Sequence, residues 1–414
     1  MALAFESEDL SAEEVRRRLR WARRQGEPAW LWPDIAPEAW REALRAIEAV
    51  VRAALAGQRG GPRLAGDPAA IGLAGYTSGV GPLLGCWLAR GLIQAEPAIA
   101  AVLALHLRHN RIRAARMQDA ALGTVEALLA AGVPTAVLKG AHTASAYFPE
   151  PGARPASDID LLVPAGATGA AEAVLRDLGF ACQGQGPRES NWRLAGQPDT
   201  PRSLSLVHAE DPWSIDMHAS LDLFVGPGAP LAALDLGEPL RTGRPWSQNP
   251  GAVSLEQPLL LLHLAAHAGS GLQSLTLLRL VELVLVIRQD TAQGRLDWRA
   301  LLEAGERTHT LAYAYPALRL CEDLAPATVP ALVLDRCARA APADVVRLVR
   351  GMTPATAQRV DGASVAAHFM WVQGLAGRLR QIAGDLVPDA GSWRALWMIY
   401  EKRAWRLVRG RFSP

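Results

Sequence analysis

Residues 138–163 read LKGAHTASAYFPEPGARPASDIDLLV, and the end of this stretch places two acids inside an apolar strand. Asp158 and Asp160 flank Ile159 and are followed by Leu-Leu-Val, so a strand here turns both carboxylates to one face. Two like charges about 7 Å apart repel, and burying them costs free energy unless a partner neutralises them. A bound cation is the usual solution, although an Asp-x-Asp motif alone more often lies at a solvated strand edge.

The same stretch also holds Lys139, which is one of only two lysines in the chain, the other being Lys402. All the remaining basic residues are arginines. A lysine kept in such a chain suggests a functional role, and a solvated position at the end of a strand is the alternative.

Size and composition predict a folded protein with a large core. The chain has 414 residues, of which 50% are hydrophobic and 20% charged. A net charge of +2 argues against a surface built to bind nucleic acid. The four cysteines lie far apart without a CxxC pair, which fits a reducing, cytoplasmic compartment. The longest apolar run, 258–266, is too short for a transmembrane segment, so none is expected.

The pattern along the chain predicts three regions: an N-terminal helical region (1–110), an α/β core (111–250) and a C-terminal helical domain (251–414). A long helical pattern near 97–131, with a break near Asn110, crosses from the first region into the second. Within the core we expect strands at 134–138, 157–163, 204–208 and 213–218, a further extended piece starting at Phe180, and helices at 141–147 and 167–178. The aromatic and arginine-rich stretch 393–411 has helical spacing and is expected to dock on the body.

A third acid lies on a later strand. Asp216 stands in WSIDMH, within the strand expected at 213–218. Three acids that converge would match what two-metal phosphoryl chemistry requires, because divalent cations there clamp the attacking and leaving oxygens. Hard cations such as Mg²⁺ or Mn²⁺ prefer carboxylate and phosphate oxygens.

The order strand, glycine, helix, loop, Asp-x-Asp strand and later acidic strand resembles the nucleotidyltransferase fold of the polymerase-beta type. The segment 138–163, together with SIDMHASL, is more closely similar to a family of uncharacterised bacterial nucleotidyltransferases. The later LLLLHLAAHAG, LLRLVELVLVI and RLDWRALLEAG also resemble that family's helical half. The resemblance covers about residues 110–324. It implies an α+β fold, with a small mixed-sheet core flanked by helical regions.

The resemblance also implies roles for individual residues. It assigns catalysis and metal binding to Asp158, Asp160 and Asp216. The nucleotide-binding candidates are Lys139, Gly140, Ala141, Arg154 and Ser157. Ala141 stands where the broad superfamily usually has serine, and the insert at 147–153 lengthens the spacing between the glycine and the first acid. For Arg154 the alternative to a phosphate contact is a salt bridge within the loop.

Four histidines are candidates for the acceptor side or for supporting roles. His218 shares a strand face with Asp216, where a structural hydrogen bond is favoured over a general base. His142 either lies near the nucleotide or, as we prefer, on a helix surface. His263 and His267 form an HxxxH pair without the third ligand that zinc needs, so core histidines facing the α/β unit are expected.

Together these features predict a cytoplasmic, Mg²⁺- or Mn²⁺-dependent enzyme. It would transfer a nucleoside monophosphate from a triphosphate, with ATP expected, to an unidentified small molecule or peptide, and release pyrophosphate. One alternative is a non-catalytic protein that reuses the fold to bind a nucleotide or peptide, which Ala141 and the long insert would fit. Another is a phosphotransferase acting at the γ-phosphate.

Overall fold

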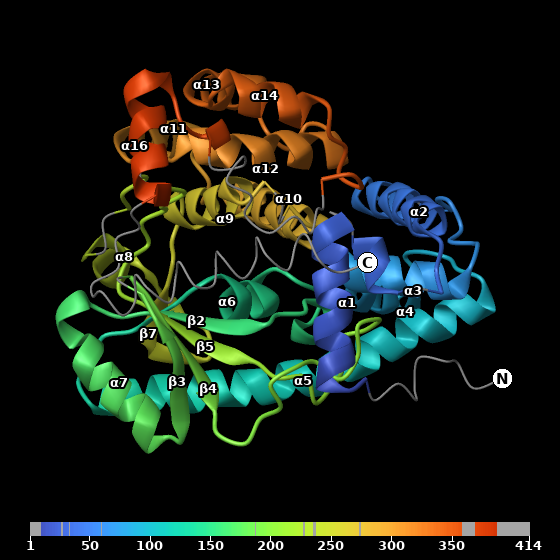
Figure 1. Cartoon of the computed structure of the whole chain (residues 1–414), viewed down its shortest axis with the longest axis horizontal. Coiled ribbons are helices and arrows are strands. Elements are labelled where there is room, and N and C mark those ends of the chain that lie inside the picture. Colours follow the sequence, from blue (N-terminus) through green and yellow to red (C-terminus); the bar gives the residue numbers. More distant parts are fainter. Residues whose placement is uncertain are drawn as a thin grey trace.

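The fold is α+β, as predicted, and consists of a seven-stranded mixed sheet enclosed by helices (Figure 1). The computed structural model describes residues 10–25, 28–32, 34–58, 60–186, 188–226, 228–234, 237–272, 275–357 and 369–386. The stretch 393–411 and its expected docking lie outside these residues. The division of the chain into three regions remains a prediction.

The sheet has the strand order β3-β4-β5-β2-β1-β7-β6. In chain order, the strands are β1 (Ala136–Val137), β2 (Asp158–Leu162), β3 (Phe180–Gln185), β4 (Glu189–Leu194), β5 (Ser214–His218), β6 (Arg244–Trp246) and β7 (Asn249–Ser254). The central strand β2 runs parallel to β5 and antiparallel to β1. Strand β4 runs antiparallel to β5 on its other side.

Helices cover both faces of the sheet (Figure 1). The described α-helices are α1 (Ala12–Gln25), α2 (Pro37–Leu55), α3 (Pro68–Thr77), α4 (Gly81–Ala89), α5 (Pro97–Ala130), α6 (Lys139–Ala146), α7 (Thr168–Asp177), α8 (Gly237–Thr242), α9 (Leu259–Ser270), α10 (Leu277–Ala292), α11 (Trp298–Arg307), α12 (Leu311–Leu324), α13 (Ala331–Ala340), α14 (Ala343–Arg350) and α16 (Gly374–Leu386). Helices α5 and α7 pack on one face through a hydrophobic cluster that includes Ile159, Leu161 and Ile215. Because side chains alternate along a strand, Asp158, Asp160 and Asp216 must point to the opposite face.

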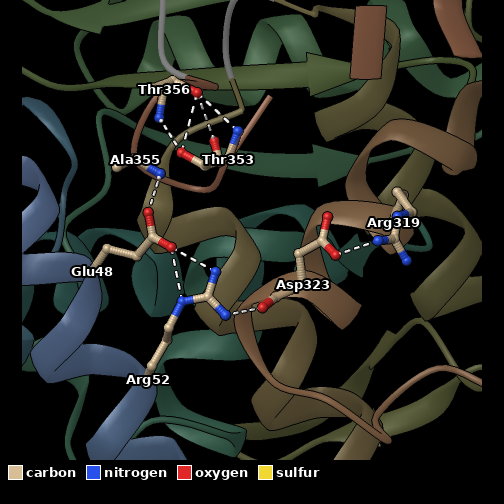
Figure 2. Close-up of polar contacts among 7 residues, drawn as sticks. All are labelled: Glu48, Arg52, Arg319, Asp323, Thr353, Ala355 and Thr356. Atoms are coloured by element: carbon tan, nitrogen blue, oxygen red, sulfur yellow. Dashed lines mark hydrogen bonds and ion pairs between the residues drawn. The ribbon is translucent and has the colours of Figure 1, made fainter. Parts of the chain in front are cut away.

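That opposite face belongs to a larger core, which joins helices that precede the sheet in the chain to helices that follow it. Residues from α2 to α5 and from α9 to α14 form one continuous buried cluster with Leu138 and Leu162. A polar contact also ties the two helical regions together (Figure 2). Glu48 of α2 pairs with Arg52 at 2.6 Å and accepts a hydrogen bond from the Ala355 amide at 2.8 Å. Arg52 donates in turn to the Asp323 carbonyl in α12.

Helix α5 is continuous through Asn110, so the expected break was wrong. The buried Asn110 amide donates to the Gly152 carbonyl at 2.7 Å and so has a partner without leaving the helix. Arg111 pairs with Glu150 at 2.7 Å beside it. These two contacts fix the insert 147–153 against α5.

The strand expected at 204–208 was also wrong. Leu204 and Leu206 are buried, but side chains take the place of a strand partner for the backbone amides. The Ser203 hydroxyl accepts from the amides of Ser205 and Leu206, and the Asp211 carboxylate accepts from that of His208. Strands β4, β6 and β7 were not predicted. The strands expected at 134–138, 157–163 and 213–218 exist as β1, β2 and β5.

Candidate active site

Three carboxylates meet on the face of β2 and β5 that lies opposite α5 and α7. Asp158 and Asp160 lie two residues apart on β2, and Asp160 is the direct register partner of Asp216 on the parallel strand β5. Each of the three offers an oxygen, and these oxygens all lie within 4.8 Å of one another. The structure therefore brings the three predicted acids together at a spacing that one or two cations can bridge.

Asp160 is the most buried of the three acids, with a side chain only 1% exposed. Its Oδ1 accepts from Lys139 Nζ at 2.9 Å and lies 3.1 Å from His218 Nε2. Burial alone would raise the pKa of Asp160, but Lys139 and His218 hold it well below its usual range. Its Oδ2 is buried and accepts no hydrogen bond from any described residue. A buried, charged oxygen without a hydrogen-bond partner is available to bind a cation.

Asp158 and Asp216 behave in the opposite way. Burial and the nearby Asp160 raise the pKa of Asp158 to about 6. The same two causes raise the pKa of Asp216. Three acids that resist simultaneous ionisation are electrostatically frustrated, and a divalent cation would relieve that repulsion.

Strand β4 supports the third acid, a contribution that sequence reasoning missed. Asn191 is the register partner of Asp216, and its amide donates to Asp216 Oδ1. The Ser214 hydroxyl lies 3.3 Å from the same oxygen. Two residues before Asn191 on β4, Glu189 approaches His218 Nδ1 at 3.5 Å. The available signal was the alternation in ESNWRL, where Ser190 and Trp192 are buried and Glu189, Asn191 and Arg193 are not.

Lys139 lies at the first residue of α6, and its side chain is 14% exposed. Its ammonium contacts Asp160 and also lies 3.1 Å from His267 Nε2 on α9. Burial and Lys139 lower the pKa of His267 well below its usual value, so its ring is neutral and Nε2 can accept. His267 thus faces the α/β unit as expected, and His263 is buried in the core. Among the described residues, no cluster of three metal-ligating side chains includes His263 or His267.

Arg154 forms a buried salt bridge with α10 of the helical half, whereas the sequence left open a phosphate contact or a bridge within the loop. Its guanidinium binds Glu282 in two places, Nε to Oε1 at 2.8 Å and Nη2 to Oε2 at 3.1 Å. The Thr143 hydroxyl donates to the same carboxylate. Gly140 lies directly beneath: a Cβ there would come within 3.1 Å of Arg154 Nη1. Gly140, in the first turn of α6, therefore leaves space for the Arg154 guanidinium.

The acids open into a cavity of about 300 Å³ between the sheet and the helical half. Its acidic wall is formed by the three aspartates and Glu189, and its other walls include Lys139, Gly140, Arg154, Ser157, His218, His267, Thr276, Arg279 and Glu282. Arg279 and Thr276 come from the start of α10 and were not predicted, because nothing in the sequence pairs that helix with the strands. The Ala141 side chain packs instead on the cluster beneath the sheet.

His142 is buried, so its expected surface position was wrong. Its ring packs edge-on against Tyr147, with centroids 5.9 Å apart, and burial lowers its pKa to about 4. It does not line the cavity.

Comparison with protein families agrees with this geometry. The family model described as an uncharacterised nucleotidyltransferase matches residues 76–326, which is more than half of the chain. The protein thus belongs to that nucleotidyltransferase family and is a transferase of phosphorus-containing groups. Neither the curated proteins nor the solved structures contain a match.

Helix length and hydropathy bear on the expected lack of a transmembrane segment. In the part of the chain that the structure describes, no single helix is long and apolar enough to cross a bilayer. The bent pair α3 and α4 meets the same criterion only when its two helices are taken together.

Proposed function

We propose that this protein transfers a nucleoside monophosphate from a nucleoside triphosphate, with ATP expected, to a small-molecule or peptide acceptor. The acceptor oxygen forms a bond to the α-phosphorus, the bond from that phosphorus to the bridging oxygen breaks, and pyrophosphate leaves. The acceptor's proton passes to water. One observation carries the proposal: three convergent carboxylates, one with an unpartnered buried oxygen, face a cavity that also holds cationic side chains.

The donor set fits Mg²⁺ or Mn²⁺. Asp158, Asp160 and Asp216 supply only hard carboxylate oxygens, which these cations prefer. We propose that the three acids hold the metal, which when bound would offset the negative charge on the phosphates and lower the pKa of the acceptor hydroxyl.

The protein's own side chains would orient the reactants. Asn191 and Ser214 hold the Asp216 carboxylate in place from two sides. Lys139 and Arg279 give the cavity wall the positive charge that a triphosphate requires. His218 is engaged with Asp160 and Glu189, which supports a positioning role over a general base. Arg154 is engaged with Glu282, which supports a role in joining the core to α10.

The test follows the label from two forms of ATP. The protein is incubated with a fraction of cellular metabolites and peptides, Mg²⁺, and ATP labelled at either the α- or the γ-phosphate. We expect α-label in a new product, γ-label only in pyrophosphate, and neither with Asp160→Asn. Transfer of γ-label to an acceptor would show a phosphotransferase instead. Nucleotide binding without transfer of label to any component of the fraction would favour a binding protein.

A cytoplasmic location is part of the proposal. All four cysteines are described and none forms a disulfide, and Cys86, Cys321 and Cys337 are buried. Free thiols fit a reducing compartment. Fractionation of cells that produce the chain at native levels should recover it with cytoplasmic markers, and recovery from an oxidising compartment would contradict the proposal.

A further inference from the structure

Lys139 places a positive charge on Oδ1 of Asp160, next to the Oδ2 that has no partner among the described residues and would face a cation. Its ammonium is 2.9 Å from Asp160 Oδ1, in a site where both side chains are largely shielded from water. At such a distance, and with little solvent screening, the ammonium offsets much of the carboxylate charge. A divalent cation that binds Asp160 would then lie within a few ångströms of this ammonium, and the two cations would repel each other.

The surroundings offer Lys139 a second position. Its side chain starts at the first residue of α6 and lines the cavity, and its ammonium also touches the neutral His267 ring on α9. Arg279 and Thr276 line the same cavity from α10. The lysine side chain is a flexible chain of four methylene groups, so its ammonium can turn into the cavity while its backbone stays fixed. A triphosphate there would supply the negative charge that the ammonium gives up on leaving Asp160.

We infer that Lys139 is an exchangeable cation that couples metal binding to nucleotide binding. In the resting protein it neutralises Asp160 and weakens metal binding. When a nucleoside triphosphate enters, Lys139 moves from Asp160 to the phosphates, and the carboxylate becomes free for the metal. This inference rests on the proposed function, because it needs a polyphosphate ligand in the cavity.

A fixed lysine would predict something different. If Lys139 binds the phosphates from its present position, its ammonium still contacts Asp160 in the complex. Removing it would then weaken nucleotide binding without strengthening metal binding in the absence of nucleotide. The affinity for metal alone therefore separates an exchanging lysine from a fixed one.

The experiment measures Mn²⁺ binding by the loss of the free-ion electron paramagnetic resonance signal. It uses the full chain, with and without an ATP analogue that has a methylene bridge between the α- and β-phosphates. The variants are Lys139→Gln and Arg279→Gln. The second removes one positive charge from the same cavity wall, where Arg279 acts on Asp158 and Asp160 through its charge, so it measures the general electrostatic effect. Thermal unfolding confirms that each variant is folded, and Lys139→Met replaces Lys139→Gln if that variant is not.

We expect Lys139→Gln to bind Mn²⁺ at least about fivefold more tightly than wild type without nucleotide. The analogue should raise the Mn²⁺ affinity of wild type by a larger factor than that of Lys139→Gln, since coupling between two ligands is reciprocal. Arg279→Gln should raise Mn²⁺ affinity alone by a smaller factor than Lys139→Gln, because Lys139 lies 2.9 Å from Asp160 Oδ1, whereas Arg279 acts on the acids at longer range.

The inference is overturned if Lys139→Gln binds Mn²⁺ no more tightly than wild type, or if Arg279→Gln has as large an effect. It is also overturned, alone, if wild type binds the analogue with Mn²⁺ and Lys139→Gln keeps the full coupling. If wild type does not bind the analogue at any Mn²⁺ concentration, the proposed function fails as well.

Discussion

The site holds carboxylates of two opposite kinds, which at the scale of single residues predict opposite effects on stability. The ionised form of Asp158 is disfavoured in the folded protein, because burial and Asp160 raise its pKa to about 6. The ionised form of Asp160 is favoured, because Lys139 and His218 outweigh its burial and lower its pKa. The fold thus disfavours the charge on one acid and favours it on the neighbour. This arrangement favours cation binding and lowers the stability of the metal-free protein.

Asp158→Asn should therefore stabilise the metal-free protein at pH 8 by about 1–2 kcal/mol, since it removes a charge that the fold disfavours. The free-energy cost of ionised Asp158 is present above its folded pKa of about 6. It fades as the pH falls toward the pKa of the unfolded chain, because Asp158 is then protonated in both the folded and the unfolded state. Urea unfolding in the presence of a chelator measures it. The gap between variant and wild type should shrink between pH 7 and pH 4, and a constant gap would contradict this explanation.

Asp160→Asn is the matched change with the opposite sign. It leaves the Lys139 ammonium, in its shielded position, without its carboxylate, so we expect a loss of about 2–4 kcal/mol in the same urea experiment at pH 8. An Asp160→Asn protein as stable as wild type would show that the ion pair with Lys139 adds no net stability.

The element scale shows how the core is joined to the helical half. Glu282 of α10 binds Arg154 and Thr143 across the interface. Glu282→Gln should lower the free energy of unfolding by about 3–5 kcal/mol, because a buried guanidinium loses its counter-charge. The double variant Arg154→Met/Glu282→Met removes both charges and should recover most of that loss in chemical unfolding. If the double variant is as unstable as the single one, the charge balance is not what the pair provides.

Helix α9, which carries His267, lies against α12 at a glycine. A Cβ on Gly269 would lie 2.1 Å from the Tyr313 carbonyl oxygen, closer than any real contact. Gly269→Ala should therefore destabilise the protein by about 1–3 kcal/mol. Gly123 in α5 has nothing within 4 Å of its Cβ position, so Gly123→Ala should stabilise by about 0.5–1 kcal/mol. Melting temperatures of the two variants compare them, and shifts of the same sign would contradict this helix packing.

The secondary-structure elements also show which features of the site could be predicted from the sequence and which could not. The alternation in DIDLL and SIDMH is local, and it was enough to put the three acids on one face of two strands. The partners of those acids come from strand register and from helices far along the chain. Asn191 reaches Asp216 only because β4 pairs with β5, and Arg279 reaches the cavity only because α10 crosses above the sheet. Such contacts depend on tertiary structure and leave no periodic signal.

At the scale of the whole molecule, helices α2 to α5 and α9 to α14 share one core with the sheet. We predict that residues 111–250 alone do not form a folded domain, because the face that bears the acids would lose the helices that bury it. Near-ultraviolet circular dichroism of that fragment should show no fixed tertiary packing, while the full chain unfolds in one transition. A folded, cooperative fragment would contradict this and support an independent core domain.

The whole-molecule arrangement also explains why the acidic site is enclosed. The sheet supplies the carboxylates, α6 supplies Lys139, and α9 and α10 close the cavity with His267 and Arg279. Each wall comes from a different part of the chain, so a nucleotide that binds here must contact the core and the helical half together.

Calorimetric titration of ATP into wild type and Asp158→Ala, each with and without Mg²⁺, tests the central claim most directly. If the three aspartates form a metal-dependent nucleotide site, wild type binds ATP with a dissociation constant of about 1–100 μM only when Mg²⁺ is present, and the variant does not bind. Binding that is equally tight without Mg²⁺, or unchanged in Asp158→Ala, would contradict the account.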